Sequence, residues 1–202
     1  GESGCGKTTI VDLICGLLKP NNGLIMADGK NIFSNLHEWR GMVSYVPQDI
    51  YLLDDSLRNN IAYGVNSEDI DDNLIVRVSK LAMLDNYIDE LEFGYETMIG
   101  ENGVKMSGGQ RQRLGIARAL YNQPKILILD EGTAALDNKS QEYVINSINS
   151  MVDEITVITI AHRLDTVKNC DLILLIEKGS VKKEISKNML SKLNIDLSKL
   201  IS

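Results

Sequence analysis

The sequence opens on a glycine-rich segment whose residue types and spacing could bind a phosphate chain. It has a glycine, four residues and then Gly-Lys-Thr. Glycines let the backbone N–H groups wrap a phosphate chain, and the start of the following helix favours anions. In such a loop Lys7 reaches the β- and γ-phosphates, and the Thr8 hydroxyl binds Mg²⁺. The alternative is an ordinary glycine-rich turn before a helix. The predicted ATP-binding residues are Gly1, Glu2, Ser3, Gly4, Cys5, Gly6, Lys7, Thr8 and Thr9.

Two carboxylates follow a run of apolar residues. Asp130 and Glu131 come directly after residues 125–129, which are predicted to form a buried strand. A carboxylate at the end of a strand beside a phosphate loop suits Mg²⁺, which prefers oxygen ligands. The adjacent Glu131 could act as the general base that activates water. The alternative is a pair of solvated acids.

Two further polar residues follow predicted strands. Gln48 comes after the strand at 42–46, and an uncharged amide there could touch both Mg²⁺ and the attacking water. His162 comes after the strand at 155–160 and could bond to the γ-phosphate. Each has an ordinary structural alternative, because glutamine in a loop and a lone histidine are both common. Their shared position at strand ends favours the catalytic interpretation.

A second helix start carries small and polar residues. Ser107, Gly108, Gly109 and Gln110 stand at the beginning of the helix predicted at 107–122. A hydroxyl and small residues at a helix N-terminus offer a second surface that could face a phosphate. The alternative is an ordinary capped helix start. If this surface cannot reach the phosphate loop of its own chain, the two would meet across a dimer.

The elements that must position these residues alternate along the chain. The apolar runs are mostly continuous and rich in Ile, Leu and Val, as in a parallel sheet covered on both faces. Strands that alternate with helices predict a doubly wound α/β fold, in which ligands bind at the carboxyl ends of the strands. The predicted strands are 23–26, 42–46, 125–129, 155–160, 172–176 and its hairpin partner 180–185. The predicted helices are 10–18, 70–80, 81–91, 107–122, 139–151 and 164–168.

Composition narrows the function classes. The 202 residues suit one α/β domain, and 44% hydrophobic residues support a core. A net charge of −7 argues against a nucleic-acid partner. The three cysteines match no zinc-site spacing, and the apolar runs are too short to span a bilayer.

The beginning of the sequence predicts that the chain is a fragment. A phosphate loop normally follows a strand, and here no residue precedes Gly1. The first strands of the sheet are therefore expected to be missing. Because a missing central strand leaves neighbouring strands unpaired, we expect the fragment alone to bind nucleotide weakly and to aggregate.

Together these residues resemble the nucleotide-binding domain of ATP-binding cassette (ABC) proteins. Six motifs occur in the family's order over nearly the whole chain. Residues 43–64, and residues 94–109 with an X-loop-like segment at 97–103, resemble the exporter branch. Met106 replaces the usual Leu of the signature, and Ala replaces the usual Ser of the D-loop. The matched positions are 1–8 (Walker A), Gln48 (Q-loop), 106–110 (signature), 126–130 with the adjacent catalytic carboxylate Glu131 (Walker B), Asp137 (D-loop) and His162 (switch histidine).

The resemblance implies a fold, a reaction and partners. The fold is that of P-loop NTPases, with a core at about 1–50 and 120–202 and a helical subdomain at about 51–119. Two domains, expected to be identical, close head to tail around Mg²⁺ and ATP, with Ser107 and Gly109 of one against the γ-phosphate held by the other.

In the exporter branch the domain follows a six-helix membrane domain in the same chain. The coupling helices of that membrane domain bind at the X-loop and beside Gln48, on the cytoplasmic face of the membrane. The resemblance thus implies a transport ATPase. The alternatives are a heterodimer, a soluble ABC-type ATPase acting on DNA, ribosomes or chromosomes, and a nucleotide-binding regulator without turnover.

Overall fold

The computed structural model describes residues 4–101, 103–130, 143–144, 146–148, 155–161, 170–187 and 189. The chain divides into two compact units. The first comprises Gly1–Arg40 and Thr159–Ser202, and the second comprises Gly41–Ile158. Within the described ranges, no helix is long and apolar enough to cross a membrane.

The first unit begins with a helix that directly follows the glycine-rich loop. Helix α1 ends earlier than predicted, because Gly16 adopts φ +68° and the N–H groups of Leu17 and Leu18 turn back to Asp12. The indole Nε1 of Trp39 donates to the Ile14 carbonyl at 2.7 Å and so ties the next helix to the end of α1. The elements are α1 (Lys7–Ile14), β1 (Met26–Ala27), β2 (Lys30–Asn31), the short 3₁₀ helix η1 (Ile32–Ser34) and α2 (Leu36–Met42).

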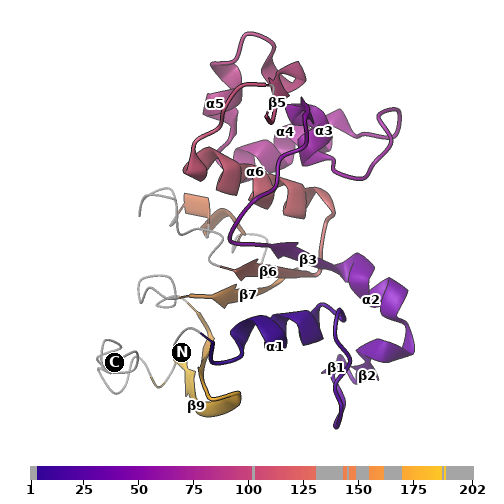
Figure 1. Ribbon diagram of the computed structural model, residues 1–202, viewed down its shortest axis with the longest axis vertical. Helices are drawn as coiled ribbons and strands as arrows, with labels where there is room; N and C mark the ends of the chain where they lie inside the picture. Colours follow the sequence, from indigo (N-terminus) through magenta and orange to yellow (C-terminus); the bar gives the residue numbers. More distant parts are fainter. Residues whose placement is uncertain are drawn as a thin grey trace. The chain divides into compact units, whose positions relative to one another are not determined.

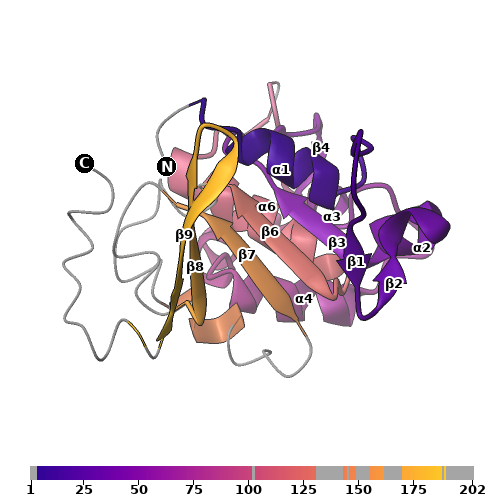
Figure 2. The ribbon, with the colours of Figure 1, turned by 90° about the horizontal axis from the view of Figure 1, so that it is seen from below.

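The C-terminal part of the first unit is an antiparallel hairpin of β8 (Leu172–Glu177) and β9 (Ser180–Ser186) (Figure 2). The two turn residues, Lys178 and Gly179, have φ +48° and +76°. Positive φ at both central positions is the turn geometry that matches the twist of a two-residue hairpin. The predicted hairpin is confirmed.

Strands β3 (Val43–Val46) and β6 (Ile126–Asp130) lie in the second unit, and β7 (Thr156–Ile160) begins in it. The strand order of this sheet is β3–β6–β7 (Figure 2). Strands β3 and β6 are parallel, with Val46 opposite Leu129. Their parallel pairing and their apolar composition confirm the predicted α/β class. All three strands begin within one residue of the predicted positions.

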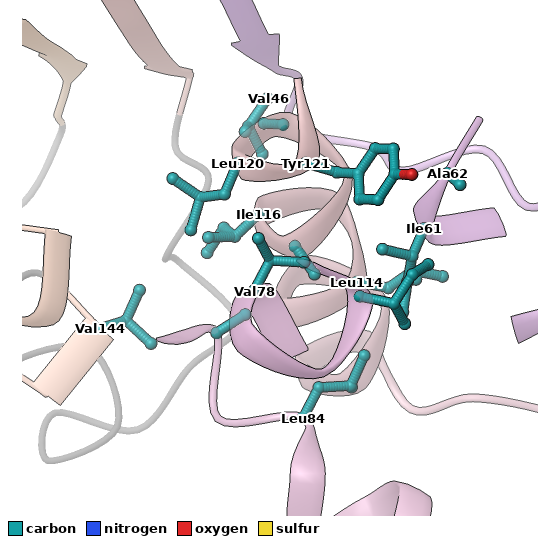
Figure 3. Packing of buried hydrophobic residues seen from close by; sticks show 14 of the residues in the cluster. Val46, Ile61, Ala62, Val78, Leu84, Leu114, Ile116, Leu120, Tyr121 and Val144 are labelled. Carbon is teal, nitrogen blue, oxygen red and sulfur yellow. The ribbon is translucent and has the colours of Figure 1, made fainter. Parts of the chain in front are cut away.

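Helices surround α6 in the second unit (Figure 1). Helix α6 packs against α3 and α4. Its buried face, which includes Leu114, Ile116 and Leu120, meets Ile61 and Val78 (Figure 3). The bounds are β4 (Asp55–Ser56), α3 (Leu57–Ile61), α4 (Asp72–Leu81), α5 (Asp85–Asp89), η2 (Gly94–Glu96), β5 (Met98–Ile99) and α6 (Gly108–Tyr121).

Two predicted helices near the C-terminal half fall largely outside the described residues. In the helix predicted at 139–151, the described residues 143–144 and 146–148 are helical. The helix predicted at 164–168 lies wholly outside the described residues.

Candidate nucleotide-binding site

The backbone of the glycine-rich loop has the shape that a bound phosphate chain needs. Gly4 has φ +77° and Gly6 has φ +102°, a region that side chains with a Cβ rarely adopt. Gly6 is also the N-cap of α1, and as a glycine it has no side chain with which to cap the helix. The N–H groups of the first turn therefore face the loop, where an anion would be favoured by the helix N-terminus.

Lys7, Thr8 and Thr9 occupy the first turn of α1. The Nζ of Lys7 lies 3.7 Å from the Sγ of Cys5, so its ammonium group folds back over the loop. The side chains of Thr8 and Thr9 are exposed. A cation and two hydroxyls next to the positive-φ glycines are the donors that a triphosphate requires.

The β8–β9 turn contacts the loop within the first unit. The N–H of Gly179 donates to the carbonyl of Cys5 at 2.9 Å. A Cβ on Gly6 would lie 3.6 Å from the Cα of Gly179. Sequence reasoning missed this support, because backbone hydrogen bonds between distant segments leave no residue pattern.

In the second unit, the ends of β3 and β6 bring Gln48 and Asp130 to the same edge of the sheet. Because Val46 pairs with Leu129, Asp130 stands at the level of the residue that precedes Gln48. The hydroxyl of Tyr45 donates to Oδ2 of Asp130 at 2.9 Å. Tyr45 is a residue that the sequence analysis missed. Its only sequence signal was its place in β3, one strand away from a candidate metal ligand.

The residues Ser107 to Gln110 form a reciprocal cap at the start of α6. The N–H of Gln110 donates to the Ser107 Oγ at 3.3 Å, and the N–H of Ser107 donates to the Gln110 Oε1 at 2.7 Å. Ser107 is exposed, and its hydroxyl hydrogen is not used in this cap. The serine can therefore cap its own helix and still donate to an external phosphate.

The structure places these groups in two separate sets. The described loop residues Gly4 to Thr9 belong to the first unit, whereas Gln48, Asp130 and the residues Ser107 to Gln110 belong to the second. Six predicted residues lie outside the described part of the chain: Gly1, Glu2, Ser3, Glu131, Asp137 and His162.

Each unit carries oxygen donors of a type that suits Mg²⁺. Thr8 offers an exposed hydroxyl, Gln48 an exposed amide carbonyl and Asp130 a half-buried carboxylate. All three are hard oxygen ligands of the kind that Mg²⁺ prefers alongside nucleotide phosphates. The bond from Tyr45 engages one carboxylate oxygen of Asp130 and fixes the orientation of the group.

Comparisons with known proteins identify the family. A family model described as ABC transporter matches residues 1–134. The chain is 42% identical over 183 residues to an ATP-dependent lipid A-core flippase of Ralstonia nicotianae, covering 90% of this chain and 31% of that protein. It is 45% identical over 182 residues to the toxin RTX-I translocation ATP-binding protein of Actinobacillus pleuropneumoniae, covering 90% of this chain and 26% of that protein.

A solved structure shares the fold. The structure of a bacterial Atm1-family ABC exporter with ATP bound superposes with a TM-score of 0.89 at 34% identity, covering 99% of this chain and 35% of that one. The chain thus spans about a third or less of the length of these three proteins.

Proposed function

The chain belongs to the ABC transporter family, and we propose that it is the ATP-hydrolysing motor domain of a membrane exporter. ATP binding and hydrolysis are the activity of this domain family. The observation that carries the proposal is the positive φ of Gly4 and Gly6 directly before the N-terminus of α1. This backbone conformation suits a loop that wraps a phosphate chain. The named functions of the relatives, lipid A-core flipping and toxin translocation, support an exporter over a soluble ATPase.

ATP is held by the loop residues 1–9 in this proposal. Lys7 neutralises the β- and γ-phosphates, and the N–H groups of the first turn of α1 bind their oxygens. Mg²⁺ would be held by Thr8, Gln48 and Asp130 and would supply charge neutralisation on the phosphates. The hydrogen bond from Tyr45 keeps the Asp130 carboxylate in a fixed orientation for this role.

Hydrolysis needs a base and a group that positions the γ-phosphate. We assign the base to Glu131, next to the metal ligand Asp130, and the phosphate contact to His162. Gln48 orients the attacking water. Each of these residues follows a strand in the sequence, and doubly wound folds bind ligands at the carboxyl ends of their strands.

Two copies of the domain complete the site. Ser107 and Gly109 at the start of α6 contact the γ-phosphate held by the other copy, and Asp137 lies at the contact between the copies. The unused hydroxyl hydrogen of Ser107 and the N-terminus of α6 supply the donors for this contact. We propose a homodimer with two such sites.

The membrane domain is the second partner. We propose that it precedes the present sequence in the same chain and that its coupling helices bind at the X-loop (97–103) and beside Gln48, on the cytoplasmic face of the membrane. We assign residues of about 51–119 to a helical subdomain and the remainder, about 1–50 and 120–202, to the core.

The test is the ATPase rate of the intact protein carrying Glu131→Gln. This change keeps the shape of the side chain and removes its basicity, so kcat should fall by about 100-fold or more. Binding of a fluorescent ATP analogue should persist. Glu92→Gln, which alters an exposed glutamate in the second unit, is the matched control and should leave kcat unchanged. Unchanged turnover in Glu131→Gln would remove the base assignment.

The exporter assignment has its own test. The native reading frame upstream of Gly1 should encode six apolar segments of about 20 residues, and the intact protein should sediment with membranes. A short lead-in without apolar segments, together with a protein that stays in the supernatant, would instead identify a soluble ATPase or a separate subunit.

A further inference from the structure

Arg118 joins the helix that begins at the signature serine to the segment that leaves Gln48. Its guanidinium donates from Nε to the Asn60 carbonyl at 2.8 Å and from a terminal nitrogen to the Tyr51 carbonyl at 3.0 Å. A third bond reaches the Asn60 Oδ1 at 3.2 Å. One side chain on α6 therefore holds two backbone carbonyls of the segment 51–60.

The side chain of Asn60 also hydrogen-bonds to the backbone of this segment. Its side chain is fully buried. The Oδ1 accepts from the Leu53 N–H at 2.9 Å, and the Nδ2 donates to the carbonyls of Leu53 at 3.1 Å and Ser56 at 3.0 Å. Asn60 thus fixes the turn between Gln48 and α3, and Arg118 fixes that turn to α6.

Apolar packing adds a close approach between the same two elements. A Cβ on Gly115 would lie only 2.4 Å from Cδ1 of Ile50, so α6 accepts Ile50 because position 115 has no side chain. Ile50 is two residues after Gln48. The glycine and Arg118 lie on neighbouring turns of α6 and face the same segment.

The guanidinium of Arg118 is partly desolvated. Burial lowers its pKa, and the neighbouring Tyr63 opposes this shift in part. The Tyr63 ring lies 5.2 Å from the guanidinium carbon, within the range of a cation–π contact. Arg118 is half-buried and makes three hydrogen bonds to one segment, so losing those partners would leave part of its guanidinium unsatisfied. The arrangement therefore favours one conformation.

We propose that Arg118 and Asn60 are positioning residues that lock the Gln48 loop to α6, so that Gln48 and Ser107 move as one rigid body during ATP turnover. This proposal rests on the proposed function, which gives Gln48 and Ser107 their roles at the γ-phosphate. A displacement of Gln48 is then transmitted to Ser107 through α6, and a displacement of Ser107 is transmitted to Gln48. The proposed rigid body does not include Lys7 or the other residues of the glycine-rich loop.

The test compares Arg118→Lys with Arg113→Lys in the intact protein. Lysine keeps the positive charge but lacks the planar fork that reaches two carbonyls at once. Arg113 lies on the same helix, and its guanidinium donates to the Met83 carbonyl, so it is the matched control. Arg118→Lys should lower kcat about 10-fold, since small misplacements of reacting groups are costly, and should leave the KM for ATP within about 2-fold.

Hydrogen exchange gives a readout that does not depend on turnover. The Leu53 N–H is protected by Asn60, so the peptide covering 50–56 should exchange about 10-fold faster in Arg118→Lys than in Arg113→Lys. Equal exchange in the two variants would overturn the lock. Faster exchange with unchanged kcat would overturn its role in turnover.

A measurement on the unaltered protein covers the case in which Arg118→Lys fails to fold. Protection of the peptide 50–56 should be the same with and without a non-hydrolysable ATP analogue. Loss of that protection on nucleotide binding, while the peptide of α6 stays protected, would overturn the rigid body. An unaltered protein without ATPase activity would instead count against the proposed function, and the exchange data would still decide whether the lock exists.

Discussion

Tyr45 on β3 and Asp130 at the end of β6 are joined by a hydrogen bond of 2.9 Å from the phenol to the carboxylate. The two residues come from neighbouring parallel strands, and Tyr45 pairs with Ile128 in the register. The side chain therefore reaches along the sheet toward its carboxyl edge. This bond holds the proposed metal ligand without occupying both of its oxygens.

Replacing Tyr45 by Phe tests this support. The ring stays, while the hydroxyl that orients Asp130 is lost. Because partners of metal ligands typically contribute 10- to 100-fold in affinity, the Mg²⁺ concentration for half-maximal ATPase activity should rise about 10-fold. Tyr51→Phe, at an exposed tyrosine, is the control and should not move it. An unchanged Mg²⁺ dependence would show that the phenol does not orient the ligand.

Replacing Gly6 by Ala tests the loop geometry. Gly6 has φ +102°, and Gly29, in the turn between β1 and β2, has φ +77°. Each alanine should cost about 1–3 kcal/mol of local strain. Only Gly6→Ala should raise the KM for ATP, by about 10-fold or more, because only that loop contacts phosphates. Equal ATP affinities in the two variants, measured by titration with a fluorescent analogue, would contradict the assignment.

Thiol labelling tests access to the loop. Cys5 lies in the loop, and ATP should protect it from N-ethylmaleimide. Burial raises the pKa of the Cys15 thiol, and the nearby Asp12 adds to this shift. Burial also raises the pKa of the Cys170 thiol, with a further contribution from Asp171. Because the thiolate is the reactive form, their labelling should increase with pH only above the range of an ordinary thiol. Site-resolved mass spectrometry at several pH values checks this. Labelling of Cys5 that is indifferent to ATP would contradict the site.

Replacing Leu114 by Ala tests the packing of α6. Leu114 is fully buried in the cluster around this helix (Figure 3). Its truncation should lower the free energy of unfolding by about 2–5 kcal/mol. Leu24→Ala, at a leucine that is 71% exposed, should change it by less than about 0.5 kcal/mol. Denaturant titration of both variants measures the difference, and similar values would mean that α6 is not the centre of this core.

Much of the fold could be predicted from local pattern. The strands β3, β6 and β7 were found because continuous Ile, Leu and Val runs mark buried parallel strands. The start of α6 could be predicted because Ser107 and the small residues after it precede a helical run, and the structure adds a capping box between Ser107 and Gln110. These signals lie within a few residues of sequence, so tertiary contacts were not needed to identify them.

Other elements could not be predicted for physical reasons. Strands β4 and β5 have two residues each, too few for an alternating pattern, and polar Asp55 and Ser56 pair with Met98 and Ile99. Helix α3, which begins at Leu57 with a Ser56 cap, has only five residues and so lacks a readable helical period. The end of α1 depended on Gly16, which has φ +68° and where a Cβ would lie only 2.4 Å from Cδ1 of Leu36.

The candidate site was likewise predicted only in part. The motif residues were identifiable because their chemistry and spacing are local. Their supports, Tyr45 for Asp130 and the pair Asn60 and Arg118 for the Gln48 segment, come from other elements. Such long-range hydrogen bonds have no signature in a single sequence.

The hydrogen bond from the N–H of Gly179 to the carbonyl of Cys5 cannot form until both residues have been synthesised. The proposed nucleotide site therefore becomes complete only late in the synthesis of this domain. Cys5 leaves the ribosome first, and Gly179 follows 174 residues later (179 − 5). At about 5–20 residues per second, the interval is roughly 9–35 s. During that interval the loop lacks one of its supports, and a nascent chain truncated before the β8–β9 turn would have to hold ATP without it.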